Sequence, residues 1–332
     1  MSGPKNIHFV RGERGAALLT VLLLVAVISI IAAIMLDRVS IATRLAANGQ
    51  SLSQARLYSV AAENLAITQI KRLVDADPAR TTNQSGWVGR EFTLPFENGL
   101  ARGRVTDGGN CFNLNSVVSG AKGNYRVNGV GVQQFKSLMY ALKIPANEAD
   151  IVAASLTDWI DSDQNLERGG AEDGYYLQLD TPYLTADRLI ADPTELRTIK
   201  GVTPDIYAAL RRWVCALPMA ELSPININTL GGDQAVLLTM MAPSYLPPER
   251  AQRALAARPA GGFAEARQFW QAAVSNLENL PRPVQRQVQV RTRWFMLDMT
   301  IELGEAELIE RALIDASLTP ARLVHRQWGE DL

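Results

Sequence analysis

Hydrophobic residues are concentrated near one end of this 332-residue chain. The segment Ala16–Leu36 contains no charged residue, and a helix of that length would cross roughly 30 Å of hydrocarbon. The segment is too long for the apolar part of an ordinary secretory signal, and polar Asp37-Arg38 follows it instead of an A-x-A cleavage site. We therefore predict a helix that spans a membrane over residues 16–36.

The helical pattern continues beyond this segment to about Asp77-Pro78. Alanine, leucine, glutamine, arginine and glutamate dominate residues 37–78, and no proline precedes Pro78. Apolar residues recur near helical spacing at Leu45, Leu52, Ala55, Ala62, Leu65, Ile70 and Leu73. A continuous helix from Ala16 would be about 60 residues and roughly 90 Å long. We expect residues 37–78 to be a stem that packs against a head domain.

Strand-like patterns occur on both sides of the central region. Trp87–Leu94 and Leu100–Val105 predict two strands joined by a turn at Asn98-Gly99. Apolar and polar residues then alternate over 295–303, and Gly304-Glu305 marks a turn. Further strands are expected at 307–317 and 322–328. We predict a head sheet built from residues 79–112 and 283–332.

The region between these strands has a helical pattern. Many of the candidate helices begin at or directly after a start residue such as Pro or Asp and stop near Gly or Pro. The candidates are 133–142, 146–159, 194–199, 204–214, 234–241, 248–257 and 263–273. The segment 218–224 divides the region into a first helical module, residues 113–220, and a second helical module, residues 221–282. The related phrases Phe112-Asn-Leu-Asn and Ile225-Asn-Ile-Asn open the two modules. The predicted fold class is therefore α+β, with a large helical insertion in an antiparallel β head.

The charge balance and the histidine content exclude several functions. The chain has 33 basic and 34 acidic residues and no polybasic block, which argues against nucleic acid as the main partner. Its two histidines, His8 and His325, are too few for a multi-histidine metal site. No G-x-S-x-G elbow or reactive cysteine context is present. An anchored extracytoplasmic enzyme therefore lacks residues to perform its chemistry.

The two cysteines, Cys111 and Cys215, both follow the predicted membrane-spanning helix. The basic residues before that helix favour a cytoplasmic N-terminus, so we expect both cysteines to lie outside the cytoplasm. An oxidising compartment favours a disulfide between them. Two separate buried thiols are the alternative, because sequence alone does not show whether the residues are close.

The N-terminal residues resemble those of type IV prepilins and pseudopilins. A short basic leader ends at Gly15, and an uncharged helix follows. This resemblance implies cleavage between Gly15 and Ala16 by a prepilin peptidase, followed by N-methylation of Ala16. Lys5, Arg11 and Arg14 favour a cytoplasmic N-terminus. We expect a single-pass protein of the inner membrane with most of the chain in the periplasm, and a net charge of −3 once residues 1–15 are removed.

Thr20 stands at the fifth mature position, where these families usually carry Glu. The K-type minor pseudopilins of type II secretion systems lack this Glu, and later motifs resemble that family in order: CFNLN at 111–115, TDWIDSD at 157–163, GGAEDGYY at 169–176, VCALP at 214–218 and ININT at 225–229. The resemblance covers most of the chain. It implies a pilin-like fold and a tip subunit that starts fibre assembly with I-type and J-type minor pseudopilins. Its role would be export of folded proteins across the outer membrane, with no catalysis and no small-molecule substrate.

The absence of Glu at this position has a physical interpretation. A buried charge in lipid is costly unless it is paired, and a Glu near the helix start can neutralise the N-terminal amine of the preceding subunit. A subunit that is first in the fibre has no such partner, so Thr20 removes the cost. Alternatively, Thr20 is an ordinary tolerated residue of a single-pass anchor.

An acidic run at 158–173 is the strongest candidate ion site. Counting from Asp161, its oxygen-bearing residues parallel the spacing of an EF-hand, but Leu166 takes the place of the required Gly and no exit helix follows. Resemblance to the K family implies calcium binding in this region. The predicted Ca²⁺ ligands are Asp161, Asp163, Asn165, Glu167, Glu172 and Asp173. A solvated loop in which Asp side chains cap turns is the alternative. Asp158 and Asp161 as a catalytic carboxylate pair have no supporting cleft signal.

A rival interpretation is a membrane-anchored DNA-binding protein. RTIKGVTPDIYAALRRW at 197–213 and ININTLGGDQAVLLTM at 225–240 resemble helix-hairpin-helix modules, whose hairpin amides bind DNA phosphates. However, the hairpin Lys200-Gly-Val-Thr203 lacks the second Gly. The second copy has Ala242-Pro-Ser-Tyr245, where Pro removes an amide donor. We therefore favour helical packing units.

Overall fold

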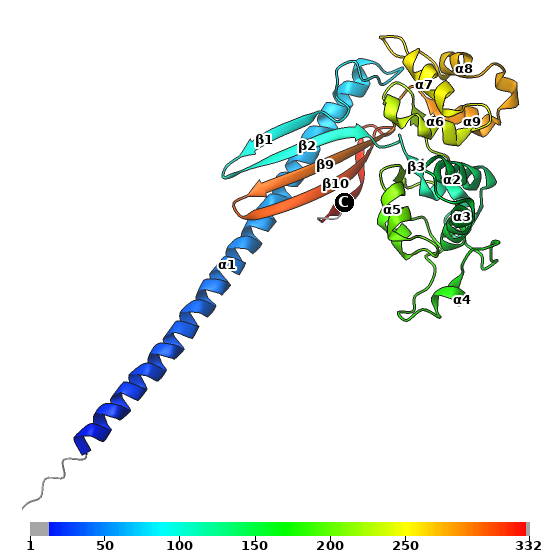
Figure 1. The fold of residues 1–332 in the computed structure, drawn as a ribbon. Helices are drawn as coiled ribbons and strands as arrows, with labels where there is room; N and C mark the ends of the chain where they lie inside the picture. Colours follow the sequence, from blue (N-terminus) through cyan, green and yellow to red (C-terminus); the bar gives the residue numbers. More distant parts are fainter. Residues whose placement is uncertain (1–12, 330–332) are drawn as a thin grey trace, which may run out of the picture.

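The structure is a computed structural model that describes residues 13–329. Residues 1–12 of the predicted leader lie outside the described part of the chain. Helix α1 spans Glu13–Ala76 without interruption and confirms the single long helix predicted from the sequence (Figure 1). It ends just before Asp77, whose carboxylate accepts a hydrogen bond from the Ala79 amide at 3.1 Å.

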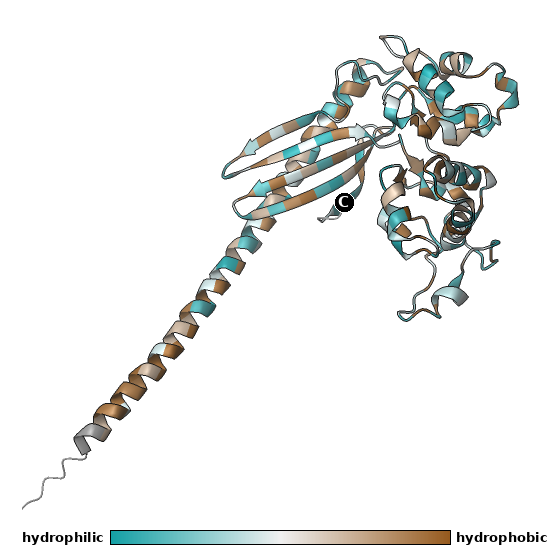
Figure 2. Ribbon diagram, in the orientation of Figure 1, coloured by the Kyte–Doolittle hydropathy of each residue, from teal (hydrophilic) through white to brown (hydrophobic). Residues whose placement is uncertain are grey.

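The first half of α1 and its second half have different surroundings. From Ala16 to Gln50 every residue is exposed, and the apolar colouring in Figure 2 is continuous along the free end of the helix. By length and composition, α1 can cross a membrane. Farther along, Ala55, Ala62, Ala66 and Ile70 are buried against the head. Small alanine side chains allow the sheet to approach the helix backbone closely.

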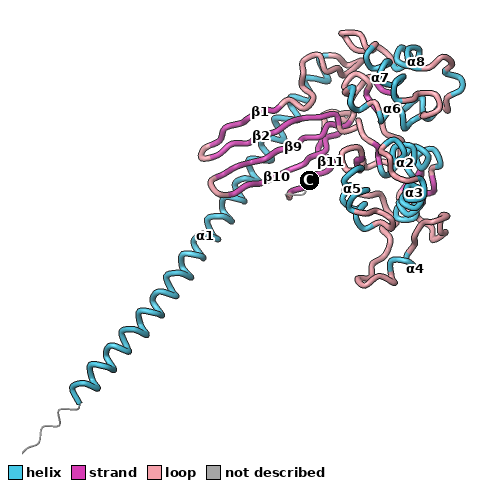
Figure 3. The backbone as a smooth tube through the Cα atoms, viewed as in Figure 1, coloured by secondary structure: helices cyan, strands magenta, loops and turns pink. Residues whose placement is uncertain are grey.

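The head is a five-stranded antiparallel sheet laid across the upper part of α1 (Figures 1 and 3). In spatial order its strands are β1 (Glu91–Phe96), β2 (Gly99–Asp107), β9 (Trp294–Leu303), β10 (Ala306–Asp315) and β11 (Arg322–Trp328). Strand β2 pairs with β9, for example Ala101 with Ile301. The prediction of one sheet built from both ends of the chain is therefore confirmed.

The turns of the sheet occur where the sequence predicted them, whereas the first strand is shifted. Asn98 and Gly304 adopt φ values of 64° and 61° in the β1–β2 and β9–β10 turns. The prediction of a strand over Trp87–Leu94 was wrong in position, because β1 runs over Glu91–Phe96. Gly89, with φ 71°, interrupts the extended backbone. Trp87 instead packs against the ring of Phe295.

The first helical module contains short elements around a core that it shares with the second module. They are β3 (Phe112–Asn113), η1 (Leu114–Val117), β4 (Val118–Ala121), β5 (Asn124–Val127), α2 (Gly129–Ala141), α3 (Ala146–Ile160), α4 (Asp173–Tyr176), η2 (Pro193–Thr198), α5 (Pro204–Leu210) and β6 (Val214–Cys215). The helix predicted over 204–214 ends at Leu210. The reason is that Val214–Cys215 pairs in parallel with Phe112–Asn113.

The second helical module is arranged in a similar way. Its elements are β7 (Ile225–Asn226), η3 (Gly232–Gln234), α6 (Val236–Met241), α7 (Pro248–Ala256), α8 (Ala266–Ala273), η4 (Leu277–Asn279), α9 (Arg282–Gln287) and β8 (Val288–Gln289). Residues 282–287 form helix α9, although the sequence analysis placed residues from 283 onward among the C-terminal strands. The parallel pair β7–β8 brings the two ends of this module together, as β3–β6 does in the first.

The two Asn-x-Asn phrases have the same structural role. The side-chain amide of Asn115 accepts a hydrogen bond from the Ile190 amide and donates to the Ile190 carbonyl, at 2.7 and 2.9 Å. Asn228 binds the amide and carbonyl of Phe263 in the same manner, at 2.7 and 2.9 Å. Because these hydrogen bonds are buried, each Asn side chain replaces water as the partner of the backbone N–H and C=O of one residue. The similarity noted in the sequence thus reflects a repeated packing device.

A buried polar network joins the head to the second module. The Asp107 carboxylate at the end of β2 accepts hydrogen bonds from the hydroxyl groups of Thr229 and Thr292. Asn110 accepts from the Asn226 amide at 2.8 Å and donates to the Thr229 hydroxyl at 3.0 Å. Burial raises the pKa of Asp107 to about 6, although its hydrogen bonds oppose this shift.

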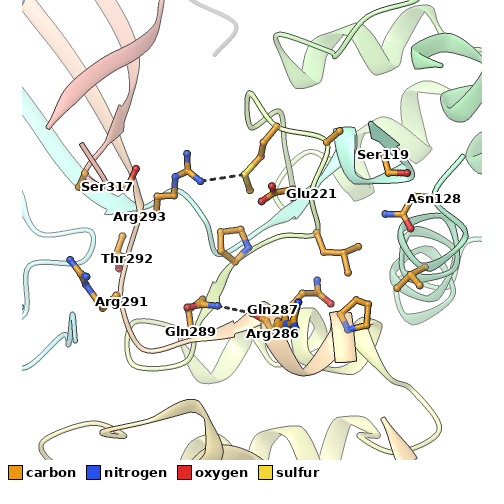
Figure 4. A pocket seen from close by; sticks show the side chains of 17 residues that line it. Ser119, Asn128, Glu221, Arg286, Gln287, Gln289, Arg291, Thr292, Arg293 and Ser317 are labelled. Atoms are coloured by element: carbon orange, nitrogen blue, oxygen red, sulfur yellow. Dashed lines mark hydrogen bonds between the residues drawn. The ribbon is translucent and has the colours of Figure 1, made fainter. Parts of the chain in front are cut away.

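Both helical modules project from one side of the head sheet, away from the axis of the stem helix (Figure 1). A pocket of about 780 Å³ lies at their junction with the head. In Figure 4, Arg293 of the head lies on one side of this pocket, and Ser119 and Asn128 of the first module lie on the other. The molecule therefore consists of a thin rod with a broad, asymmetric head.

Candidate cation site, disulfide and membrane stem

Three carboxylates of the acidic run are buried together. Asp158 and Asp161 lie at the end of α3, and Glu172 immediately precedes α4. Their relative exposures are 0%, 1% and 8%. Four of their oxygens are buried without a hydrogen-bond partner: Asp158 Oδ2, Asp161 Oδ1 and both Glu172 oxygens. Buried carboxylate oxygens without hydrogen bonds or a counter-charge are costly, which makes this cluster a candidate cation site.

The electrostatics of the cluster point in the same direction. Burial, followed by repulsion from the neighbouring carboxylates, raises the pKa of Glu172 to about 8 and that of Asp161 to about 7. The pKa of Asp158 rises to about 6 from burial, opposed by backbone hydrogen bonds from Glu167 and Ala171. Like charges crowded in a buried space disfavour ionisation unless a cation is present.

The other predicted ligands have different surroundings. Asp163 and Asn165 are exposed, and Asp163 accepts a hydrogen bond from the Asn165 amide at 2.8 Å. Glu167 is half-buried, and its amide donates to Asp158 Oδ1 at 3.1 Å. Asp173 accepts from the amide and hydroxyl of Thr185 at 2.9 and 2.7 Å. The structure thus brings Asp161 and Glu172 together and holds Asp163 and Asn165 at the surface.

Sequence reasoning missed Asp158 and Asp187 as members of this cluster. Asp158 was considered only as a catalytic carboxylate, although its spacing of three from Asp161 places both on one face of a helix. Asp187, whose charge contributes to the raised pKa values of Asp161 and Glu172, carries no motif in the sequence. Only the folded loop brings it near.

The cluster fits a hard cation in its chemistry, and its loop is shaped around Asp158. Carboxylate oxygens suit Ca²⁺, which tolerates six to eight ligands in irregular geometry. A Cβ on Gly170 would lie 2.0 Å from Asp158 Oδ2, so the loop can close over this carboxylate only with glycine there. Within residues 13–329, however, no three acidic, His or Cys side chains already form a ligand group. Cation binding would require the side chains to reorient.

The helix-hairpin-helix-like hairpin faces this loop. Lys200 donates to the carbonyls of Gly169 and Gly170 at 3.3 and 2.8 Å, and its ammonium lies 4.8 Å from the Tyr175 ring centre. A Cβ on Gly201 would lie 2.8 Å from a methyl carbon of Ile151. The hairpin is therefore packed against α3 and the acidic loop, and its lysine is engaged within the chain.

Cys111 and Cys215 form a disulfide, the pairing favoured by the sequence analysis, with a Cα–Cα distance of 5.8 Å. Both residues are buried in a small apolar cluster with Leu217, Trp294 and Leu313. This cluster lies between the core of the head and the core of the modules. The bond joins the start of the first module to its end and fixes the module where it leaves the sheet.

Thr20 is accommodated within α1 without a partner subunit. Its hydroxyl donates to the Ala17 carbonyl at 2.9 Å, so the polar group is satisfied inside its own helix. Gly15 and Ala16 belong to the same helix. The stem therefore presents an uncharged, internally hydrogen-bonded surface from Ala16 to Leu36.

Comparison with known proteins identifies the family. Two family models, both described as type II secretion system (T2SS) protein K, match residues 110–219 and 225–291. Type II secretion system protein K of Pectobacterium carotovorum subsp. carotovorum is 31% identical over 319 residues, covering 96% of this chain and 97% of the relative. This chain belongs to the protein K family of type II secretion systems. The protein K of Aeromonas hydrophila is 32% identical over 301 residues, covering 89% of this chain and 90% of that protein.

A solved structure extends the likeness to the fold. It is the GspK-GspI-GspJ complex from the type 2 secretion system of enterotoxigenic Escherichia coli, with a TM-score of 0.73 and 30% identity. The match covers 85% of this chain and 98% of the solved chain. As a protein K, this chain is a minor pseudopilin and a structural component of the secretion apparatus. The predicted α+β pilin-like fold with its helical insertion is thereby confirmed.

Proposed function

We propose that this protein K occupies the tip of the pseudopilus and initiates its assembly with I-type and J-type minor pseudopilins. The observation that carries the proposal is the shape of the head: two helical modules project sideways from the sheet. Another subunit stacked above would meet these modules, whereas a subunit added below meets only the stem. A complex of GspK with GspI and GspJ from the solved relative supports the choice of partners.

Membrane insertion of the stem would then define the starting point for the fibre. Ala16–Leu36 would lie in the inner membrane, with the N-terminus in the cytoplasm and the head in the periplasm. A prepilin peptidase would cut after Gly15 and the Ala16 amine would be methylated. Thr20 lacks the carboxylate that would pair with the amine of an earlier subunit, which suits a first subunit.

Calcium is the cofactor that the acidic loop supports best. The carboxylates of Asp158, Asp161 and Glu172 would form the buried part of the site. Further oxygens would come from the remaining predicted ligands, Asp163, Asn165, Glu167 and Asp173. A bound divalent cation would supply the positive charge that the cluster lacks. The loop between α3 and η2 would then keep its buried carboxylates ionised and its position on the first module fixed.

Labelling of assembled fibres tests the tip position. Pseudopili sheared from cells that carry an epitope on an exposed residue of the second module should bind antibody at one end only. An epitope on the major pseudopilin in the same fibres is the control and should label their whole length. Even labelling of this protein along the fibres would contradict the proposal. Loss of fibres in cells lacking the protein, with restoration on its re-expression, tests initiation.

The DNA-binding alternative is less well supported, because the Lys200 ammonium is already engaged by the Gly169 and Gly170 carbonyls and the Tyr175 ring. A gel-shift assay with the full chain in detergent separates the two functions. Phosphate-driven binding should weaken steeply as salt rises. A salt-sensitive shift would favour the DNA alternative.

A further inference from the structure

A cleft of about 830 Å³ separates the outer face of the head sheet from the first helical module. Arg197, Arg211 and Arg212 line it on the module side. Arg104 on β2 and Arg311 on β10 line the sheet side. Five arginines therefore converge on one cleft in a chain whose overall charge is slightly negative.

The carboxylates near the cleft neutralise only some of these arginines. Arg212 pairs with Asp233 at 3.7 Å. Arg104 and Arg311 share the single carboxylate of Asp298, at 3.4 and 2.8 Å. Within the described residues, Arg197 and Arg211 have no acidic group within ion-pair distance. The guanidinium of Arg197 lies over the Tyr207 ring at 5.9 Å. The cleft thus retains positive charge that an anionic ligand could pair with.

Two carboxylates in the cleft wall are already engaged. Asp192 accepts hydrogen bonds from Thr194 and so caps η2. Asp107 is occupied by the hydroxyl groups of Thr229 and Thr292. Neither carboxylate forms an ion pair with Arg197 or Arg211. These two arginines therefore remain available to a ligand that enters the cleft.

His325 provides a second, independent observation. Its side chain lines the same cleft from β11, and its Nε2 atom is buried without a hydrogen-bond partner. A buried polar atom without a partner is unfavourable. Rotation of the half-buried His325 ring toward the cleft would bring Nε2 within reach of a ligand's carboxylate or peptide group. Charge and an unfilled hydrogen-bond position therefore occur together.

The cleft is held open by rigid elements. The Cys111–Cys215 disulfide forms part of its wall and fixes the module relative to β2. Arg104 and Arg311 stand on paired strands, and Arg211 follows the last turn of α5. The backbone positions of these arginines are therefore fixed, and a guanidinium can donate two parallel hydrogen bonds to a carboxylate.

We propose that this cleft binds an extended, carboxylate-rich peptide segment of a partner protein. Arg197 and Arg211 would pair with its acidic side chains, and His325 Nε2 would complete a hydrogen bond to it. A nucleic-acid strand fits less well, because single strands require exposed aromatic platforms. Tyr207, the aromatic residue of the cleft lining besides the His325 ring, is already covered by Arg197.

The test uses the full chain in detergent and fluorescence anisotropy of a labelled Glu-Gly repeat peptide. The wild type should bind this peptide, and should not bind a Lys-Gly repeat of the same length. Arg197→Ala combined with Arg211→Ala should weaken binding at least about tenfold, since both charge-assisted pairs are lost. The matched control is Arg253→Ala with Arg267→Ala, two exposed arginines of the second module outside the cleft.

A folding defect is distinguished from a binding defect by the pair Arg197→Lys and Arg211→Lys. Because lysine keeps the charge, this variant should retain binding closer to wild type than the alanine pair. His325→Ala should weaken binding by a smaller factor. No binding of the Glu-Gly peptide, or an equal loss in the control pair, would overturn the proposal. So would tighter binding of an oligothymidine strand, or displacement of the peptide by equimolar inorganic phosphate.

Discussion

Arg326 on β11 forms a bidentate ion pair with Glu63 on the stem helix, in which Arg326 Nε lies 2.5 Å from Glu63 Oε1. The Glu63 side chain is only 4% exposed. Buried Glu310 on β10 lies 3.9 Å from the same guanidinium nitrogen. One arginine therefore faces two buried carboxyl groups where the stem meets the sheet.

Replacing Arg326 should loosen the attachment of the head to the stem. Arg326→Ala would leave Glu63 and Glu310 buried without their cation, and breaking a buried pair in this way costs about 3–5 kcal/mol. We expect a loss of this size in the unfolding free energy measured by urea denaturation in detergent. Arg102→Ala is the control, because its pair with Glu302 at 3.2 Å is exposed. It should cost less than about 1 kcal/mol. Equal losses in the two variants would contradict the assignment.

Glu310 should also make stability depend on pH. Burial, then its hydrogen bond with Glu63, raises the pKa of Glu310 from its ordinary value of 4.5 to about 7. Between these values the folded state binds more protons than the unfolded state, so the contribution of Glu310 to stability falls as pH rises. Glu310→Gln should remove this dependence. The measured difference in unfolding free energy between Glu310→Gln and wild type should therefore grow from pH 4.5 to 7. A constant difference across this range would show that Glu310 keeps its ordinary pKa.

Replacing a buried carboxylate of the acidic loop should have opposite effects on thermal stability with and without calcium. In calcium-free protein at neutral pH, the raised pKa of Glu172, about 8, means that folding has to protonate this carboxylate. Glu172→Gln removes that cost and should raise the melting temperature. The same change should abolish much of the stabilisation by added Ca²⁺, which for a bound cation is about 2.7 kcal/mol at a hundredfold excess over Kd. Asp158→Asn should behave similarly, since Asp158 is fully buried beside Glu172.

Two exposed residues complete this experiment. Asp163→Asn tests whether a surface position of the predicted ligand set joins the site, and Asp180→Asn, outside the acidic run, is the control. Calorimetric titration gives the Ca²⁺ affinity of each variant. Unchanged affinity in both Glu172→Gln and Asp158→Asn would exclude this cluster as the site.

Local periodicity was sufficient to predict most of the architecture. The alternation over 295–303 gave β9, since one face of the strand packs on the alanines of α1 while the other is polar. The helix predicted over 146–159 is α3, with an end one residue later. In contrast, the β4–β5 hairpin and α9 were missed, because each strand has only four residues and the helix only six, too few to show a clear periodicity.

The candidate site was only partly predictable, because the burial of its residues depends on the tertiary structure. Spacing within the acidic run identified Asp161 and Glu172, which the fold buries together. It could not separate them from exposed Asp163 and Asn165, because exposure is decided by how the loop closes over α3. Asp187 enters the cluster only through tertiary structure.

Processing of the leader gives a test of the N-terminal assignment. A prepilin peptidase has to accommodate the residue before the cut, so Gly15→Val should leave the precursor uncut, and intact mass should correspond to Met1 at the N-terminus. The wild type should begin at Ala16 and be heavier by one methyl group than the unmodified mature chain. Gly49→Ala is the control, since a Cβ there would meet nothing within 4 Å and the residue lies far from the cut. This variant should be processed normally. A mature, methylated N-terminus in Gly15→Val would show that another bond is cut, and the stem would then begin elsewhere.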